Sequence, residues 1–187
     1  MSSYLQKERP MARLPYADLN TPEVQPLVQR IVAERGSVLH LYQMLLHSPP
    51  LAQGWLAFFT AVRQQLSLPG DLRELVIMRI AYLNGAPYEA DQHAPIALQE
   101  GVTPAQLQAL PHEPDDASFQ VFTPVQRSVL RLCDEMTRHI QFDEAILQEV
   151  RGHLGERQTV ELTATIAGYN LVSRFLEALQ IHSHDPR

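Results

Sequence analysis

Apolar residues along this chain recur at intervals of three and four, the spacing typical of α-helices with one buried face. The period-two alternation of half-buried strands and the turn signals of hairpins are missing. Two apolar runs show the helical spacing clearly: Leu72, Leu75, Val76, Ile80 and Leu83, and then Val129, Leu132, Cys133 and Met136. The pattern therefore predicts an all-α protein.

Helix-start signals also recur, each a hydroxyl side chain followed by proline. The hydroxyl can cap the first backbone amides, and proline is tolerated in a helix's first turn. Asp71 followed by Glu74 is close to a capping box, a further start signal. The hydroxyl–proline pairs are Thr21-Pro22, Ser48-Pro49, Thr103-Pro104 and Thr123-Pro124.

These signals predict a compact bundle of about eight helices. The expected helices cover residues 21–35, 38–46, 49–66, 71–84, 87–100, 104–110, 124–140 with 143–153, and 156–181. The helices around 75–83 and 162–179 are apolar nearly all round, so we expect them at the centre of the bundle or in a subunit interface. Residues 111–122 are expected to form a loop. We interpret residues 1–20 as an N-terminal arm and 21–187 as a single domain.

Composition narrows the class of protein. A chain of 187 residues, 45% of them hydrophobic, suits one domain with a substantial core. No run reaches the ~18 uninterrupted apolar residues that a membrane span needs, and the first residues lack the apolar segment of a signal peptide. We therefore expect a cytoplasmic protein with no membrane partner. The net charge of −6 comes without a basic run, which argues against a nucleic-acid partner.

Cysteine usage limits redox chemistry. The single cysteine, Cys133, excludes an intrachain disulfide and a cysteine-based zinc cluster. It falls on the apolar stripe of its helix, which is typical of a buried thiol rather than a reactive one.

The residues suited to catalysis concentrate between 73 and 102. One helix there starts at Pro87 and carries Glu89 and His93, four residues apart and so on one face. If Glu74 of the preceding apolar helix reached them, desolvation would raise a glutamate pKa and lower a histidine pKa, which favours proton transfer near neutral pH. Antiparallel packing would leave Glu74 far from Glu89, so only a steep crossing or a neighbouring helix brings all three together. The structural alternative is that both glutamates stabilise helix N-termini.

The same segment carries a family resemblance. It resembles the motif E-x11-C-x2-C-x3-H of the carboxymuconolactone decarboxylase / alkyl hydroperoxidase D-like family, with Glu74 and His93 at the glutamate and histidine positions. Ala86 and Glu89 occupy the two cysteine positions, so the chain is similar to the subgroup without redox cysteines. The tripeptide HSP at 47–49 with the tryptophan at 55, and the segment AGYNLVSRF at 167–175, resemble further parts of that subgroup.

This resemblance implies an all-α bundle of the alkyl hydroperoxidase D-like type. It also implies a symmetric homo-oligomer, commonly a trimer or hexamer, with a small-molecule pocket around the motif near a subunit interface.

Three functions stay open. The favoured one is acid–base, lyase-type chemistry on a small organic acid or lactone, with Glu74, Glu89 and His93 as catalytic groups. A non-catalytic oligomeric module that binds a small ligand is the first alternative. Peroxidase-related activity is disfavoured, because Ala86 is no nucleophile and Glu89 cannot form a disulfide. The sequence predicts no bound cofactor and no metal site.

Candidate substrate-binding residues lie on the two apolar helices. The planar guanidinium of Arg79 or Arg174 can hold a substrate carboxylate, although a buried salt bridge to a glutamate is the favoured explanation of either arginine. Tyr169 and Asn170, within a turn of Arg174, need partners if they are buried and can complete the network around His93.

Overall fold

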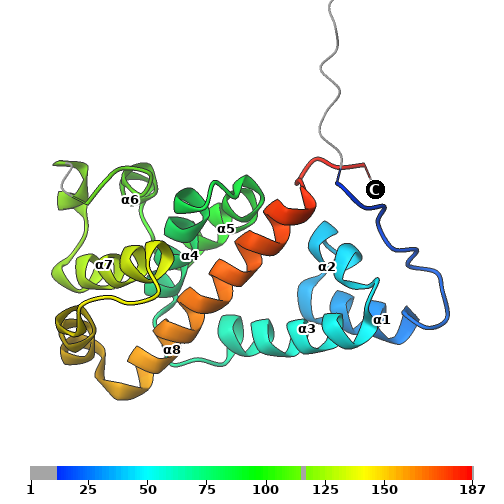
Figure 1. Cartoon of the computed structure of the whole chain (residues 1–187), viewed down its shortest axis with the longest axis horizontal. Coiled ribbons are helices and arrows are strands. Elements are labelled where there is room, and N and C mark those ends of the chain that lie inside the picture. The colour runs from blue at the N-terminus through cyan, green and yellow to red at the C-terminus, as the bar shows by residue number, and fades with distance from the viewer. Residues whose placement is uncertain (1–11, 115–116, 187) are drawn as a thin grey trace, which may run out of the picture.

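The computed structural model describes residues 12–114 and 117–186. Every regular element in these ranges is helical (Figure 1), which confirms the predicted all-α fold. The helices are α1 Gln25–Arg35, α2 His40–Leu45, α3 Pro49–Gln64, α4 Gly70–Leu83, α5 Pro87–Gln99, α6 Pro104–Ala109, the 3-10 helix η1 Ala117–Val121, α7 Pro124–Arg138 and α8 Glu144–Leu179. None of the described helices is long and apolar enough to cross a membrane.

The two threonine–proline starts in the second half of the chain are confirmed. Thr103 and Thr123 each accept a hydrogen bond from a backbone amide three residues on, and the side chains of Gln106 and Gln126 bond back to them. These reciprocal bonds are complete capping boxes. They fix where α6 and α7 begin.

One prediction about a helix end is wrong, and another is confirmed. Helix α1 begins at Gln25 rather than at Thr21-Pro22, because the residues between form a turn in which the backbone amides of Val24 and Gln25 bond to Thr21 O. The expected break between helices 143–153 and 156–181 is confirmed, because the backbone of α8 is non-helical at Gly155. Gly155, with φ of 74° and ψ of 176°, makes a kink between its two parts, a conformation that glycine adopts most easily.

The predicted capping box at the start of α4 is also wrong. Pro69 occupies the N-cap position, and the Asp71 side chain instead accepts a hydrogen bond from Gln126 Nε2. Glu74 turns into the interior of the protein, where it is completely buried. The acid at this position therefore does not cap the helix.

Helix α4 is the centre of the molecule. All of its residues from Leu72 to Ala81 are buried, and it packs against α5, α7 and α8. Figure 1 shows α8 running diagonally across the molecule, with α4 to α7 on one side of it and α1 to α3 on the other. The prediction that the apolar 75–83 helix is central is confirmed.

The described part of the N-terminal arm packs against the C-terminal end of the chain. The backbone amide of Arg13 donates to Leu179 O at 2.8 Å, and the Tyr16 hydroxyl donates to the Asp185 carboxylate. Residues 12–20 have no regular secondary structure. The rest of the arm, residues 1–11, and positions 115–116 of the expected loop lie outside the described residues.

Candidate active site

A buried cluster of charged side chains joins α4 to α5. Oε2 of Glu74 lies 2.7 Å from Nδ1 of His93, and Nε2 of His93 lies 3.7 Å from Oε2 of Glu89. Glu74, Glu89 and His93 expose only 0%, 4% and 5% of their surface. His93 lies one turn beyond Glu89 on α5, so its ring lies between the two carboxyl groups. The structure thus brings the three candidate catalytic residues together.

A fourth residue, Arg73, extends this cluster towards the surface. Its Nε donates to Oε1 of Glu74 at 3.1 Å, and its Nη2 donates to Oε1 of Glu100 at 2.9 Å. Glu100 fits here because Gly70 has no side chain: a Cβ at position 70 would lie 1.8 Å from Glu100 Oε2. The sequence interpretation missed Arg73, although an arginine on a nearly all-apolar helix is itself a signal for a buried charged partner.

The hydrogen bonds around Glu74 determine which nitrogen of His93 carries a hydrogen. Burial alone would raise the pKa of Glu74, but the hydrogen bond and charge of His93, together with Arg73, lower that pKa below its usual value. Glu74 is therefore ionised near neutral pH, and an ionised carboxylate only accepts hydrogen bonds. Nδ1 of His93 must donate to it, which leaves Nε2 as the nitrogen that faces Glu89.

Glu89 is in the opposite electrostatic state. Burial raises the pKa of its carboxyl group, and the charges of His93 and Arg63 oppose that effect only in part. Its Oε2 has no hydrogen-bond partner among the described residues. A buried polar atom without a partner costs about 1–3 kcal/mol, so Glu89 is not explained by stability. It can hold a proton at a pH where an ordinary glutamate has lost one.

Glu89 and His93 line a cavity of about 70 Å³. The Tyr169 ring stands edge-on to His93, with 5.2 Å between ring centroids and an interplanar angle of 89°. Apolar cavities that bind benzene are about twice as large, so the group that reaches the depth of this one is small. The rest of the wall comes from α2, α3, α5 and α8 and includes the aromatic side chains of Tyr42, Trp55, Phe59 and Tyr88.

Arg63 of α3 also lines this cavity, and the sequence interpretation missed it. A signal was present, because Arg63 follows Trp55 and Phe59 at intervals of four and so continues their stripe on α3. The structure places all three side chains on the cavity wall.

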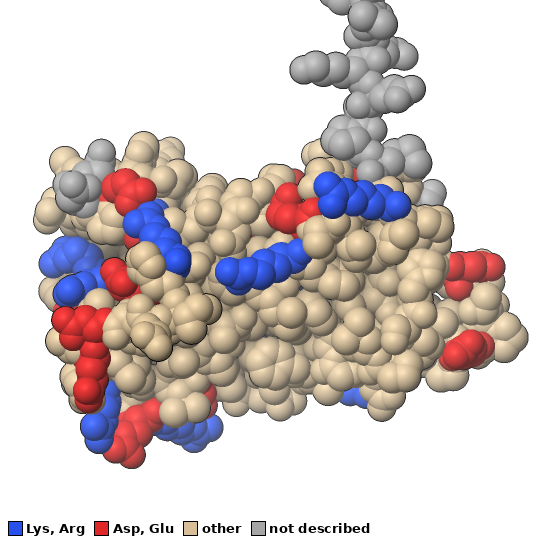
Figure 2. All heavy atoms as spheres, viewed as in Figure 1, with Lys and Arg blue, Asp and Glu red and all other residues tan. Residues whose placement is uncertain are grey.

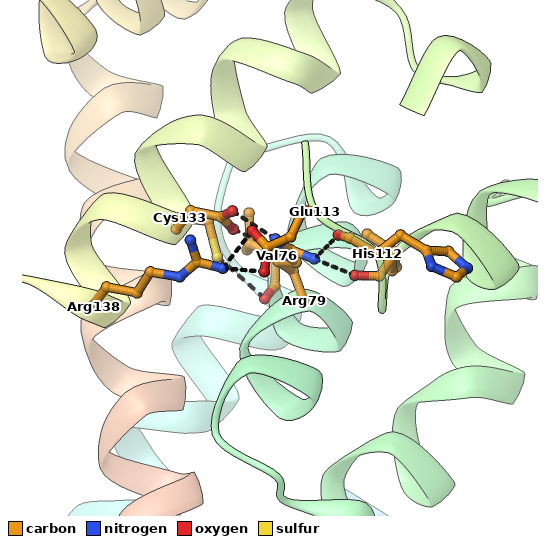
Figure 3. Close-up of polar contacts among 8 residues, drawn as sticks. Val76, Arg79, His112, Glu113, Cys133 and Arg138 are labelled. Carbon is orange, nitrogen blue, oxygen red and sulfur yellow. Dashed lines mark hydrogen bonds and ion pairs between the residues drawn. The ribbon is translucent and has the colours of Figure 1, made fainter. Parts of the chain in front are cut away.

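Arg79, a predicted substrate-binding residue, lies elsewhere (Figure 3). It is 1% exposed and forms a two-pronged ion pair with Asp134, with both N–O distances 2.6 Å. Its Nη1 also donates to the backbone oxygens of Leu110 and His112. Through these bonds the guanidinium connects α4 to α7 and to the segment after α6. Arg79 does not line the cavity and holds the fold together.

The other three predicted substrate-binding residues, Tyr169, Asn170 and Arg174, do not lie together at one site. Tyr169 lines the cavity, as described. Asn170 points away from it: the amide accepts from Asn84 Nδ2 and donates to Thr137 Oγ1, each at 3.0 Å, and so joins α8 to the end of α4 and to α7. Arg174 is exposed and lies 3.2 Å from Asn170 Oδ1. Neither Asn170 nor Arg174 is placed to touch a ligand in the cavity.

Within the described residues, neither a reactive thiol nor a metal-binding group is present. The prediction that Cys133 is buried is confirmed; its thiol donates to Val76 O, and burial raises its pKa well above the usual range (Figure 3). Such a thiol does not form the thiolate that reacts with peroxides. No group of three or more His, Cys, Asp and Glu side chains in these ranges is arranged to hold a metal ion.

Solved structures with the same architecture are numerous but distant in sequence. An uncharacterized peroxidase-related protein from Silicibacter sp. TM1040 is 18% identical, with a TM-score of 0.78 over 98% of this chain and 100% of that one. A peroxidase-related protein with an alkylhydroperoxidase AhpD core, from Ralstonia eutropha JMP134, is 17% identical, with a TM-score of 0.77 over 95% of both chains. The debrominase Bmp8 in complex with 2,3,4-tribromopyrrole is 16% identical, with a TM-score of 0.73 over 95% of this chain and 93% of that one. At such identities the likeness shows the fold alone.

Sequence comparison assigns one segment of the chain to a family. No curated protein sequence is significantly similar to this chain. Residues 49–135, however, match the family model of the carboxymuconolactone decarboxylase family, and this segment runs from α3 to α7 and contains Glu74, Glu89 and His93. The segment 49–135 therefore belongs to the carboxymuconolactone decarboxylase family, and the chain around it has the alkyl hydroperoxidase D-like fold.

Proposed function

We propose that this protein is an enzyme that transfers protons to and from a small organic molecule, with His93 as the exchanging group. The observation that carries the proposal is the 2.7 Å hydrogen bond between Glu74 and Nδ1 of His93. A histidine held at one ring nitrogen by a carboxylate presents the other nitrogen in a fixed direction and tautomer. Here the free nitrogen, Nε2, faces Glu89 beside the cavity.

The two glutamates have different roles in this proposal. Glu74 is a positioning residue, which orients the ring and stabilises the cation that forms when Nε2 accepts a proton. Glu89 is the acid. When Nε2 removes a proton from a carbon next to a carbonyl group, Glu89 donates its own proton to the carbonyl oxygen, and a neutral enol results. Return of a proton from His93 to carbon and of the enol proton to Glu89 resets both groups.

The finer form of the proposal is a lyase-type reaction on a small organic acid or lactone. The family to which residues 49–135 belong supports it, since that family is named for a lactone decarboxylase. Loss of carbon dioxide from a β-keto acid passes through the same enol. The same cavity groups therefore serve both proton exchange and decarboxylation.

A binding protein without catalysis is the second candidate, favoured by the aromatic wall of the cavity. Bmp8, which shares the fold, forms a complex with a small ring compound. Peroxide reduction stays disfavoured, because Ala86 is at the motif position of the first cysteine and Cys133 is buried away from the cavity.

Proton exchange in D₂O tests the main proposal. Proton NMR of a panel of small γ-lactones and β-keto acids would follow the loss of signals next to the carbonyl group and the release of carbon dioxide. We expect catalysis with at least one compound, and a loss of about 10²–10⁴-fold in His93→Gln, the usual contribution of a positioned acid or base. His153→Gln, at an exposed histidine of α8, is the matched control and should leave the rate unchanged. A rate that survives His93→Gln would refute the assignment.

The oligomeric state is a further part of the proposal: a homo-oligomer, trimer or hexamer, that buries apolar surface of α3 and α8. Phe58 is 44% exposed and Leu171 51% exposed. A Cβ at Gly168 would lie 3.0 Å from Phe58, so the glycine lets α3 approach α8 at this surface. Figure 2 shows few charged side chains over α3 on the face in view. Light scattering after gel filtration tests this, and Leu171→Glu should reduce the measured mass.

A further inference from the structure

We propose that Arg63 selects the ligand of this cavity and that this ligand is a small monocarboxylate. The inference rests on the proposed function for the identity of the site. It goes further in choosing an acid over a neutral lactone, and in assigning the recognition of its charge to an arginine of α3. Arg79 and Arg174, the arginines that the sequence suggested for this task, do not reach the cavity.

The position of Arg63 fits that role. It lines the cavity from α3, while His93 and Glu89 line it from α5. Its positive charge acts on the groups around the cavity, since it lowers the pKa of Glu89 and of Tyr169 against the larger effect of burial. A ligand held by Arg63 therefore lies beside the two groups that exchange protons.

Arg63 differs from the two buried arginines of α4, which both form ion pairs with carboxylates. Arg73 is paired with Glu74 and Glu100. Arg79 is paired with Asp134 in the same way. Among the described residues, however, no carboxylate forms an ion pair with Arg63, which is partly buried.

The acid in the cavity lining, Glu89, does not supply the missing charge. Burial keeps Glu89 in the neutral form to a higher pH than an ordinary glutamate. The cavity wall thus carries a positive charge without its counter-charge. A partly desolvated guanidinium attracts an anion, and its planar fork matches the two oxygens of a carboxylate.

Size and lining restrict the acid further. A volume of about 70 Å³ admits a carboxylate and a few carbon atoms. Trp55, Phe59 and Tyr169 supply flat apolar walls, which suit a short, planar carbon chain. A second carboxylate on the ligand would lie against these rings or against Glu89 without a cation to pair with. The cavity therefore accommodates a ligand with a single negative charge.

Binding of two acids and their neutral amides tests the inference without any need for turnover. The probes are propionate and crotonate, with propionamide and crotonamide, titrated at neutral pH and followed by ligand-observed NMR. We expect the wild-type protein to bind each acid at least about tenfold more tightly than its amide, a value typical of a charge-assisted hydrogen-bonded pair. Arg63→Gln should abolish that preference. Arg63→Lys should keep part of it, since lysine retains the charge and loses the fork.

Matched variants separate this inference from the proposed function. Arg131→Gln, at an exposed arginine of α7, should bind the acids as the wild type does. His153→Gln, at an exposed histidine of α8 outside the cavity lining, should also bind them. Equal binding of acid and amide by the wild type, no binding of the acids, or an unchanged preference in Arg63→Gln would each overturn the inference.

The two ideas can also fail independently. If the acids bind through Arg63 and no compound exchanges protons, the inference holds and the catalytic proposal fails. If a neutral lactone turns over at the same rate in Arg63→Gln, proton transfer holds and the inference fails. Thermal melting of each variant confirms that it is folded before either comparison is made.

Discussion

Nδ1 of His93 lies 2.7 Å from Oε2 of Glu74, although nineteen residues separate them in the sequence and they come from different helices. This hydrogen bond fixes the imidazole ring between Glu74 and Glu89. Because it also sets the tautomer, its effect on the reaction should be distinguishable from its effect on the fold.

Glu74→Gln should slow proton exchange by about 10²–10⁴-fold. The amide of glutamine can donate to Nδ1, so the hydrogen of a neutral His93 moves to Nε2 and the base facing the cavity is lost. Nitrogen-15 NMR of the histidine side chain reports the tautomer directly. The wild type should show a protonated Nδ1 and the variant a protonated Nε2; the same tautomer in both would contradict the role assigned to Glu74.

Glu89→Gln should stabilise the protein at neutral and higher pH. The folded-state pKa of Glu89 is raised, so unfolding releases its proton above the ordinary glutamate value of 4.5, and the wild type loses stability as the pH rises towards the folded-state pKa. Glutamine does not ionise and avoids this loss. We expect urea unfolding to give a gain of about 1–3 kcal/mol near pH 8 that shrinks towards pH 4. A gain that grows as the pH falls would mean that Glu89 is ionised in the folded protein.

Arg79→Met should destabilise the fold by about 3–5 kcal/mol in urea unfolding, since it leaves Asp134 buried without its partner. The double variant Arg79→Met/Asp134→Leu should recover part of that loss, because no unpaired charge remains. Arg131→Met removes an exposed pair with Glu149 and should cost no more than about 1 kcal/mol. If Arg79→Met and Arg131→Met lower the free energy of unfolding equally, the Arg79 ion pair does not have the structural role assigned to it.

Cys133 should not react with a thiol reagent in the native protein and should react fully once the protein is unfolded. With a dithiol reductant in excess, the wild type and Cys133→Ala should both fail to reduce an organic hydroperoxide, because the thiol is 0% exposed and its pKa is raised by burial. Turnover in the wild type that disappears in Cys133→Ala would show that this thiol has replaced the missing motif cysteines.

The sequence predicted those features that depend on neighbours in the chain. Thr103 and Thr123 cap their helices through residues three positions on, so the signal is complete within one turn. Glu74 is different, because an acid near a helix N-terminus can either cap the helix or turn inwards. Glu74 turns inwards because it bonds to His93 of another helix. The spacing of apolar residues along the chain holds no information about that contact.

The arginines show the same limit. Arg79 and Arg63 both follow helical spacing among apolar residues, and either could have faced a ligand. Which one does so depends on how α3 and α4 are rotated about their axes in the bundle. Asp134, which binds the Arg79 guanidinium and so keeps it from a ligand, lies 55 residues away in the sequence. Side-chain placement at the site is therefore a tertiary property, even where the helices themselves are local.

Gly70 gives this site an unusual means of adjustment. Any side chain there would displace Glu100, which is itself partly exposed and shares Arg73 with Glu74. The ion pair between Arg73 and Glu100 would be disturbed, and with it the environment of Arg73, which helps to lower the pKa of Glu74. Substitution of Gly70, in directed evolution or among natural relatives, can thus alter the electrostatics of the site from outside the cavity, because Glu100 occupies the space that a side chain at position 70 would need.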